Sequence, residues 1–210
     1  MRRSQHVRET SVEERHGFAE VLPNVGGVGG HFGRDRAPPG APDVIVGIIS
    51  DTHGLLRPEA IMALDGAERI VHAGDIGSPA ILDRLAEIAP VVAVRGNNDR
   101  ATWAASLPDV VVTDIAGARV CVVHDLEELR VDPVQEGIDI IVSGHSHRPG
   151  IARRGHVIFL NPGSAGPRRF TLPIALARLR LDPTGPRAEI IELDVAEPGA
   201  RKNRRIRPVL

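Results

Sequence analysis

The segment that decides the fold is residues 44–54, which read VIVGIISDTHG. Its first six residues form an unbroken apolar run, a pattern typical of a strand that is buried on both faces of a parallel sheet. Asp51 and His53 follow this run directly, and both can bind a metal ion. In open α/β sheets, ligands bind beyond the carboxyl ends of the strands. The segment therefore predicts a central strand that leads into a functional site.

Helical and strand-like segments alternate downstream of this strand. We expect parallel strands at 69–72 and 91–94 and helices at 58–64 and 79–88, with Ser78 as a cap of the second helix. In the second half we expect mainly strands, at 110–115, 119–123, 138–142, 157–160, 174–181 and 188–193. The pattern predicts an α/β (α+β) fold, in which two mixed β-sheets pack face to face and helices flank them.

The composition excludes several classes of protein. Lys and Arg total 26 against 27 Asp and Glu, so there is no strong nucleic-acid signal. No apolar run reaches the roughly 18–20 residues that span a bilayer, so we expect no membrane partner. Cys121 is the only cysteine, which excludes an intrachain disulfide and is typical of a small buried residue. We therefore expect a cytoplasmic protein.

The two ends of the chain differ from the middle. Residues 1–42 lack apolar periodicity and are rich in Gly and Pro, which predicts a disordered N-terminal arm or residues upstream of the true start. Residues 195–210 form a basic tail, for which a solvated segment is the simpler interpretation than a site for an anionic partner. The remaining segment, 43–194, is predicted to be the folded domain.

Metal-capable side chains follow five of the predicted strands. Any one of them alone is weak evidence, because a surface loop or a hydrogen-bonded buried histidine would look the same. Five strand ends with such side chains are a much stronger signal, and the mixture of donors suits borderline to hard divalent ions. The seven candidate ligands are Asp51, His53, Asp75, Asn97, His124, His145 and His147.

These residues, in the motifs Asp51-x-His53, Gly74-Asp75, Gly96-Asn97-x-Asp99, His124 and Gly144-His145-x-His147, resemble the calcineurin-like metallophosphoesterase superfamily. The short spacings, and the later segment 161–164 (NPGS), are similar to its small bacterial and archaeal phosphodiesterase branch, the YfcE type. The resemblance covers about residues 44–193. It implies a dinuclear centre that hydrolyses a small phosphoester, and in this branch a phosphodiester, by in-line attack of a hydroxide shared by two metal ions.

Transferred residue by residue, the resemblance assigns a role to each candidate. It implies one metal ion on Asp51, His53 and His147, a second on Asn97, His124 and His145, and Asp75 as the bridge. The catalytic residues that it implies are Asp75, Asn97, His124 and Asn98. The cofactors would be two divalent ions; we expect Mn²⁺, with Ni²⁺, Fe²⁺, Zn²⁺ and Mg²⁺ as alternatives.

The sequence departs from the family pattern at two positions. Asn98 stands where many relatives have His and this branch often has Cys; an amide cannot act as a general acid, but it can donate a hydrogen bond to a phosphate oxygen. Asp125 stands where Gly is common, and it could orient an imidazole or repel an anionic substrate. We expect His72 to be a packed or supporting histidine, and Asp99 to hold the loop around Asn97.

Other functions remain open from the sequence. The family includes a retromer subunit that serves as a scaffold, so a non-catalytic interaction module is the main alternative, although the seven filled ligand positions favour an enzyme. A metal-dependent binding or sensing protein is a weaker alternative. Substrate specificity is expected to lie in loops such as 100–108 and 148–154. A homo-oligomer is left open.

Deletion of residues 1–42 should leave the melting temperature and the metal-dependent activity unchanged. The arm carries His6, His16 and His31, but ordering it to bring them to a metal would cost roughly 1–2 kcal/mol per fixed residue. The measurement compares thermal unfolding and turnover of the full-length and truncated proteins. A large drop in either property would show that the arm covers a sheet edge or completes the site.

Overall fold

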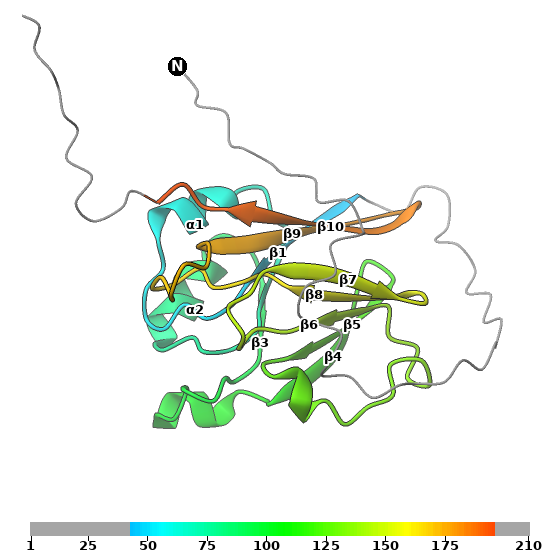
Figure 1. Cartoon of the computed structure of the whole chain (residues 1–210), viewed down its shortest axis with the longest axis horizontal. Helices are drawn as coiled ribbons and strands as arrows, with labels where there is room; N and C mark the ends of the chain where they lie inside the picture. The colour runs from blue at the N-terminus through cyan, green and yellow to red at the C-terminus, as the bar shows by residue number, and fades with distance from the viewer. Residues whose placement is uncertain (1–42, 196–210) are drawn as a thin grey trace, which may run out of the picture.

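The computed structural model describes residues 43–195, and within this range two five-stranded sheets pack face to face (Figure 1). The expected N-terminal arm, and all but the first residue of the expected basic tail, lie outside the described residues. The predicted architecture of two packed mixed sheets with flanking helices is confirmed.

The first sheet is built around the apolar strand that opens the domain. Its strand order is β10-β9-β1-β2-β3, with β1 (Val44–Ile49) in the centre. Strands β2 (Arg69–His72) and β3 (Val91–Ala93) run parallel to β1, whereas β9 (Ala175–Asp182) and β10 (Gly185–Glu192) add an antiparallel hairpin on the other side. The expected βαβαβ unit is present, and its three strands point their carboxyl ends to the same edge.

The second sheet has the order β4-β5-β6-β8-β7. Strands β4 (Val110–Ile115) and β5 (Ala118–Val123) form the predicted hairpin. Strands β6 (Ile140–Val142) and β8 (Val157–Asn161) continue parallel to β5, and β7 (Gly150–Arg154) closes the sheet antiparallel to β8. The ends of β5 and β6 therefore also lie at a common edge.

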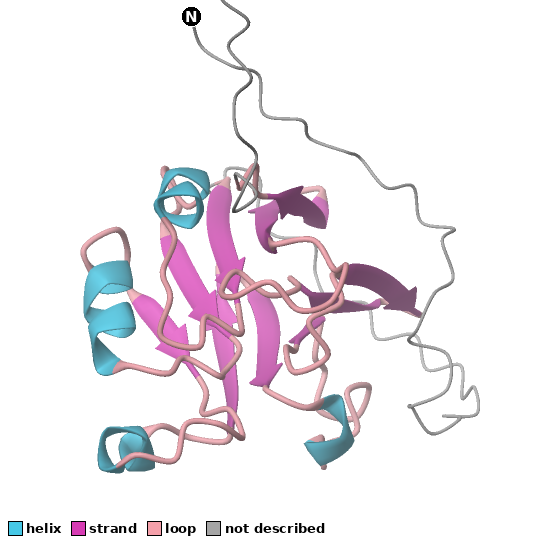
Figure 2. Ribbon diagram, turned by 60° about the vertical axis from the view of Figure 1, so that its left-hand side comes forward, coloured by secondary structure: helices cyan, strands magenta, loops and turns pink. Residues whose placement is uncertain are grey.

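Three apolar clusters hold the layers together. The largest lies between the sheets, where Val46 and Ile48 of β1 face Val122 of β5 and Val142 of β6. A second lies under α1 (Pro58–Ala63) and α2 (Pro79–Ala86), which cover the outer face of the first sheet (Figure 2). A third surrounds Cys121 on the outer face of the second sheet, where burial raises the pKa of its thiol to about 11. Strand β1 is therefore buried on both faces, as its sequence predicts.

Several local expectations need correction. Residues 150–154, expected within a specificity loop, form strand β7, because Ile151 and Ala152 pair with β8 and pack toward the apolar clusters. Ser78 precedes α2 in extended conformation, but its hydroxyl makes no capping hydrogen bond. The short 3₁₀ helices η1 (Thr102–Ser106) and η2 (Leu126–Glu128) were not anticipated. Within residues 43–195, no helix is long and apolar enough to cross a membrane.

Leu64→Ala should lower the free energy of unfolding by about 2–5 kcal/mol, because Leu64 is 1% exposed and its loss would leave a cavity between α1 and the first sheet. Met62, within α1 and two residues before Leu64, is 61% exposed. Met62→Ala is therefore the matched control and should change stability by less than about 0.5 kcal/mol. Chemical denaturation of both variants checks this. Equal losses would mean that α1 is not packed as described.

Candidate metal centre

The seven predicted ligands come together at one edge of the sandwich, where five strand ends meet. Strands β1, β2 and β3 of the first sheet end there, and so do β5 and β6 of the second. The loops after these strands carry, in chain order, Asp51 and His53, then Asp75, Asn97, His124, and finally His145 and His147. The parallel direction of the strands within each sheet is what brings these loops together.

One group of side chains combines Asp51, His53 and His147. The Nε2 atoms of the two imidazoles are 3.3 Å apart, and Asp51 Oδ1 lies 3.2 Å from His147 Nε2 and 3.9 Å from His53 Nε2. One ligand atom from each residue falls within 4.8 Å of the others, so a single ion could contact all three. This is the trio that the family resemblance implies for the first metal.

A second group surrounds the side-chain amide of Asn97. Its Oδ1 lies 3.0 Å from His124 Nε2 and 3.1 Å from His145 Nδ1. His124 is buried, and its Nδ1–H donates to the carbonyl of Ala73, 2.7 Å away, which leaves Nε2 facing Asn97. His145 is more exposed, with 47% of its side chain accessible. The three residues implied for the second metal are therefore neighbours.

Asp75 lies between the two groups. Its Oδ2 atom is 3.7 Å from Nε2 of His53 and 3.5 Å from Nε2 of His124, so one carboxylate oxygen faces an imidazole from each group. Ligand atoms of Asp51, Asp75 and His124 also fall within 4.8 Å of one another, so Asp51 could take part in either metal position. This position is consistent with the bridging role that the family resemblance implies for Asp75, and that role stays a prediction.

The donor atoms fit a cation. Oδ1 of Asp51 is buried and accepts no hydrogen bond among the described residues, although Oδ2 accepts from the Ser50 hydroxyl at 2.6 Å. An unpaired carboxylate oxygen in a buried site is costly unless a positive group compensates it. Two imidazole nitrogens of His53 and His147 face that same oxygen. A divalent ion would satisfy all of these atoms, and the mixed oxygen and nitrogen donors suit it.

Burial and neighbouring groups shift the pKa values of three candidate ligands in different directions. Burial alone raises the pKa of Asp75, but hydrogen bonds from His124 and Asn98 outweigh it and hold that pKa well below its usual range. Burial lowers the pKa of His53 more than the carboxylates of Asp75 and Asp51 raise it, which keeps the imidazole neutral. Burial also opposes protonation of His124, but Asp75, Asp51 and the Ala73 carbonyl raise its pKa to about 9. Metal binding at His124 would therefore release a proton.

The backbone of these loops is strained. Five of the seven candidate ligands have positive φ angles, which non-glycine residues rarely adopt: Asp51 (54°), His53 (45°), Asp75 (54°), His145 (64°) and His147 (58°). Such conformations cost about 1–3 kcal/mol each and persist only where the surroundings impose them. Here the His53 amide donates to the Asp75 carbonyl at 2.8 Å, which locks one strained loop onto the next.

Two glycines let the loops approach closely. A Cβ atom on Gly96 would lie 2.1 Å from the backbone nitrogen of Asp75, and one on Gly144 would lie 2.0 Å from the Ser50 hydroxyl. Any side chain at either position would force neighbouring loops apart. Both glycines therefore belong to the construction of the site.

Several supporting contacts surround the candidate ligands. Asp99 accepts hydrogen bonds from the backbone amides of Gly96, Ile76 and Gly77, which confirms that it holds the loop around Asn97. Asn161 donates to the Gly144 carbonyl at 2.6 Å and to Ser146, and thereby supports the His145 loop. Sequence reasoning did not predict the support from Asn161, whose only local signal is the NPGS motif at 161–164.

Asn98 contacts Asp75 directly. Its backbone amide donates to Oδ1 at 2.8 Å and its side-chain amide donates to Oδ2 at 2.6 Å. The sequence suggested a contact with substrate phosphate for this side chain, and that role stays a prediction. In the structure, Asn98 holds the carboxylate that lies between the two groups.

Asp125 occupies the position after His124 where Gly is common in the family. Its Oδ2 lies 3.6 Å from Nε2 of His145, while Oδ1 accepts from the Glu127 amide at the start of η2. Nδ1 of His145, the nitrogen on the other side of the ring, faces Asn97. The contact with Nε2 of His145 is consistent with an orienting carboxylate, and both this role and repulsion of an anionic substrate stay predictions.

Comparisons with known proteins place the chain in a family. The model of the calcineurin-like phosphoesterase superfamily domain matches residues 44–184, and the chain belongs to this superfamily. A probable metallophosphoesterase from Methanothermobacter thermautotrophicus is 38% identical over 160 residues, which cover 70% of this chain and 92% of that protein. The family expected from the strand-end motifs is therefore confirmed.

Solved structures show the same fold. The phosphoesterase YfcE from E. coli has 26% identity and a TM-score of 0.52, over 66% of this chain and 88% of that one. A structure described as a novel archaeal phosphodiesterase has 21% identity and a TM-score of 0.59, over 70% and 99% of the two chains. Vacuolar protein sorting 29 from Cryptosporidium parvum has 20% identity and a TM-score of 0.58, over 72% and 98%.

His72 should make the metal-free protein sensitive to acid. It is fully buried, its Nε2 lies 2.9 Å from the Thr52 hydroxyl, and burial lowers its pKa from 6.5 to about 4. Because the folded-state pKa is the lower one, His72 adds stability above pH 6.5 that is lost as the pH falls toward 4. Between pH 7 and pH 5 the wild type should lose about 2 kcal/mol more than His72→Gln.

The measurement is urea unfolding of both proteins, stripped of metal, at the two pH values. Comparing the two proteins cancels the contribution of the other titratable groups to the pH dependence, because those groups are present in both. The interpretation of His72 as a neutral supporting residue fails if the pH dependence is the same in both.

Proposed function

We propose that the protein is a dinuclear metal-dependent phosphodiesterase. Asp51, His53 and His147 would hold one divalent ion and Asn97, His124 and His145 the other, with Asp75 between them. The observation that carries the proposal is the position of Asp75 Oδ2, 3.7 Å from His53 of one group and 3.5 Å from His124 of the other. Membership of the calcineurin-like phosphoesterase superfamily supports the phosphoester as substrate.

The chain's own residues would prepare this centre for catalysis. When bound, a pair of divalent ions supplies an activated water and neutralises charge that develops on the phosphoryl oxygens. Asp75 would stay anionic because His124 and Asn98 lower its pKa, and the two hydrogen bonds from Asn98 would fix its orientation. No side chain of the site is required as a nucleophile.

The identity of Asn98 limits the substrates. Since an amide does not titrate near neutral pH, it cannot protonate a leaving group. We therefore expect the protein to act best on diesters whose leaving group is already stable as an anion. The likeness to a structure described as a phosphodiesterase, and the resemblance to the YfcE-type branch, are consistent with a diester.

Metal loading should give about two divalent ions per chain, and the loaded protein should hydrolyse bis(p-nitrophenyl) phosphate, with Mn²⁺ the most effective ion. Elemental analysis measures the first quantity, and release of p-nitrophenol in Mn²⁺, Ni²⁺, Fe²⁺, Zn²⁺ and Mg²⁺ measures the second. Binding without turnover under every metal would favour a scaffold or a sensing protein. Less than one ion per folded chain would contradict the metal site itself.

Asp75→Ala should abolish hydrolysis, whereas Asn98→Ala should lower kcat about 10–100-fold, the range typical of residues that orient a metal ligand. The control is Asp114→Ala, which removes an exposed carboxylate on β4 away from the site. Steady-state kinetics and elemental analysis should be run on all three variants. If Asp75→Ala and Asn98→Ala lose activity equally and both retain two metal ions, the assigned roles are wrong.

A further inference from the structure

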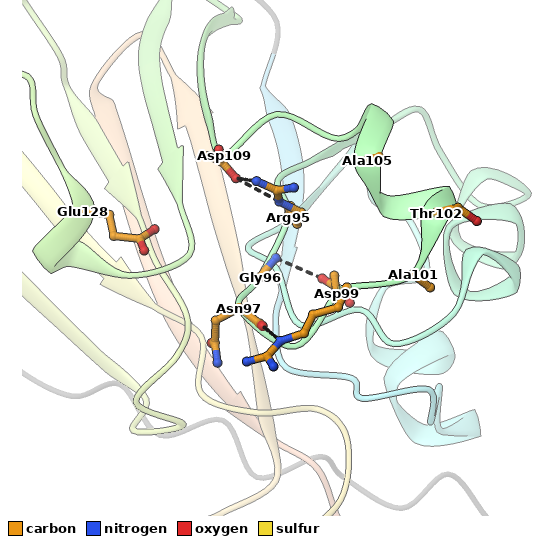
Figure 3. A pocket seen from close by; sticks show the side chains of 10 residues that line it. Arg95, Gly96, Asn97, Asp99, Ala101, Thr102, Ala105, Asp109 and Glu128 are labelled. Carbon is orange, nitrogen blue, oxygen red and sulfur yellow. Dashed lines mark hydrogen bonds and ion pairs between the residues drawn. The ribbon is translucent and has the colours of Figure 1, made fainter.

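A cavity of about 440 Å³ adjoins the candidate metal centre at Asn97 (Figure 3). The loop after β3 and the helix η1 form one wall, and Glu128 of η2 stands across from them. Small-molecule sites commonly enclose about 300–1,000 Å³, so the cavity is large enough for a substituent of a substrate. Asn97 belongs both to this lining and to the cluster of His124 and His145, which makes the cavity and the metal centre contiguous.

Most of the charged groups of the lining already have partners. The guanidinium of Arg95 donates twice to Asp109, at 3.0 and 2.6 Å. The carboxylate of Asp99 accepts three backbone hydrogen bonds and is buried. These residues build the wall of the cavity and have little capacity left for a ligand.

Three side chains of the lining have polar atoms that remain available to bind a ligand. Arg100 uses its Nε atom to donate to the Asn97 carbonyl at 3.0 Å, so its terminal nitrogens remain available beside the metal centre. Within residues 43–195, neither the carboxylate of Glu128 nor the hydroxyl of Thr102 has a hydrogen-bond partner. Arg100 offers donors, Glu128 only acceptors, and Thr102 both.

The other residues of the lining indicate which kind of ligand group the cavity would bind. Gly96, Ala101 and Ala105 are small, so these parts of the lining add little bulk to the cavity. None of the ten described lining residues is aromatic, so the cavity offers no aromatic side chain on which a nucleobase or a nitrophenyl ring would stack. The lining combines the Glu128 carboxylate, which accepts hydrogen bonds, with the Arg100 guanidinium, which donates them. This combination suits a ligand group that carries several hydroxyls.

We propose that this cavity binds a hydroxyl-bearing alcohol of the phosphodiester, such as a sugar, with Glu128 accepting from its hydroxyls and Arg100 donating to its oxygens. The inference rests on the proposed phosphodiesterase function, because the phosphate must lie at the metal centre for its ester group to reach the cavity. It makes Glu128 and Arg100 specificity-determining residues, while the groups that bind the metal ions remain common to all substrates.

The test compares two diesters that release the same p-nitrophenol: methyl riboside 5-(p-nitrophenyl phosphate), and cyclopentylmethyl p-nitrophenyl phosphate, which lacks the hydroxyls. The Mn²⁺-loaded wild type should have a kcat/KM about tenfold higher for the riboside, as expected for hydrogen bonds to charged groups. Glu128→Ala and Arg100→Ala should each reduce this preference severalfold, mainly through KM. Glu127→Ala, which removes a neighbouring exposed carboxylate outside the lining, should keep it.

Calorimetric binding of methyl riboside 5-phosphate gives a readout that does not depend on turnover. Glu128→Ala should weaken this binding about tenfold relative to Glu127→Ala, while the affinity for inorganic phosphate should differ less than twofold between them. If both diesters are hydrolysed equally well by the wild type, or if the two Glu variants bind the riboside phosphate alike, the cavity does not have this role. If no diester is hydrolysed, the phosphodiesterase proposal fails, and the calorimetric comparison then decides on the cavity alone.

Discussion

The structure depends on the burial of two carboxylates, Asp51 and Asp75, at the edge where the two sheets meet. Asp51 is 0% exposed and Asp75 is 2% exposed, and with His124 their ligand atoms fall within 4.8 Å of one another. Two like charges removed from water destabilise a fold unless positive or hydrogen-donating groups surround them. The imidazoles, the amide of Asn98 and the hydroxyl of Ser50 provide part of that compensation. Among residues 43–195, Oδ1 of Asp51 has no hydrogen-bond partner, and a cation bound there would complete the compensation.

This requirement accounts for the unusual local geometry. The ligand loops are short, and their residues take left-handed backbone angles in order to point several side chains at one place. The packing of the sandwich beneath the loops offsets the conformational free energy of these backbone angles. Its inter-sheet cluster contains residues such as Ile48, Val122 and Val142, each fully buried. A rigid core and strained loops together hold the donors in place before any ion or substrate arrives, which is the arrangement that catalysis by positioning requires.

Under the two proposals, the candidate metal centre and the adjoining cavity would have separate functions. The chain belongs to the calcineurin-like phosphoesterase superfamily, which indicates the class of reaction without defining the substrate. The cavity is built from the loop after β3, η1 and η2, segments that contribute little to the inter-sheet core. Changes there can alter which ester is recognised while the sheets and the ligand loops stay the same. Asn97 connects the two parts, since it faces His124 and His145 and also lines the cavity.

The sequence by itself determined the buried strand at 44–49, the parallel βαβαβ unit, the family, and the identity of the seven candidate ligands. Each of these is a local property: an apolar run, the polar residue that follows it, or a short motif. Strand β7 was missed because Arg153 and Arg154 obscure its alternation, and the contact of Asn98 with Asp75 was missed because the two lie 23 positions apart. Only the tertiary structure decided that His53 meets His147, 94 residues away, that Asp75 lies between two groups of donors, and that a cavity opens beside Asn97. Distances between loops follow from sheet register and packing, and no local pattern in the chain contains them.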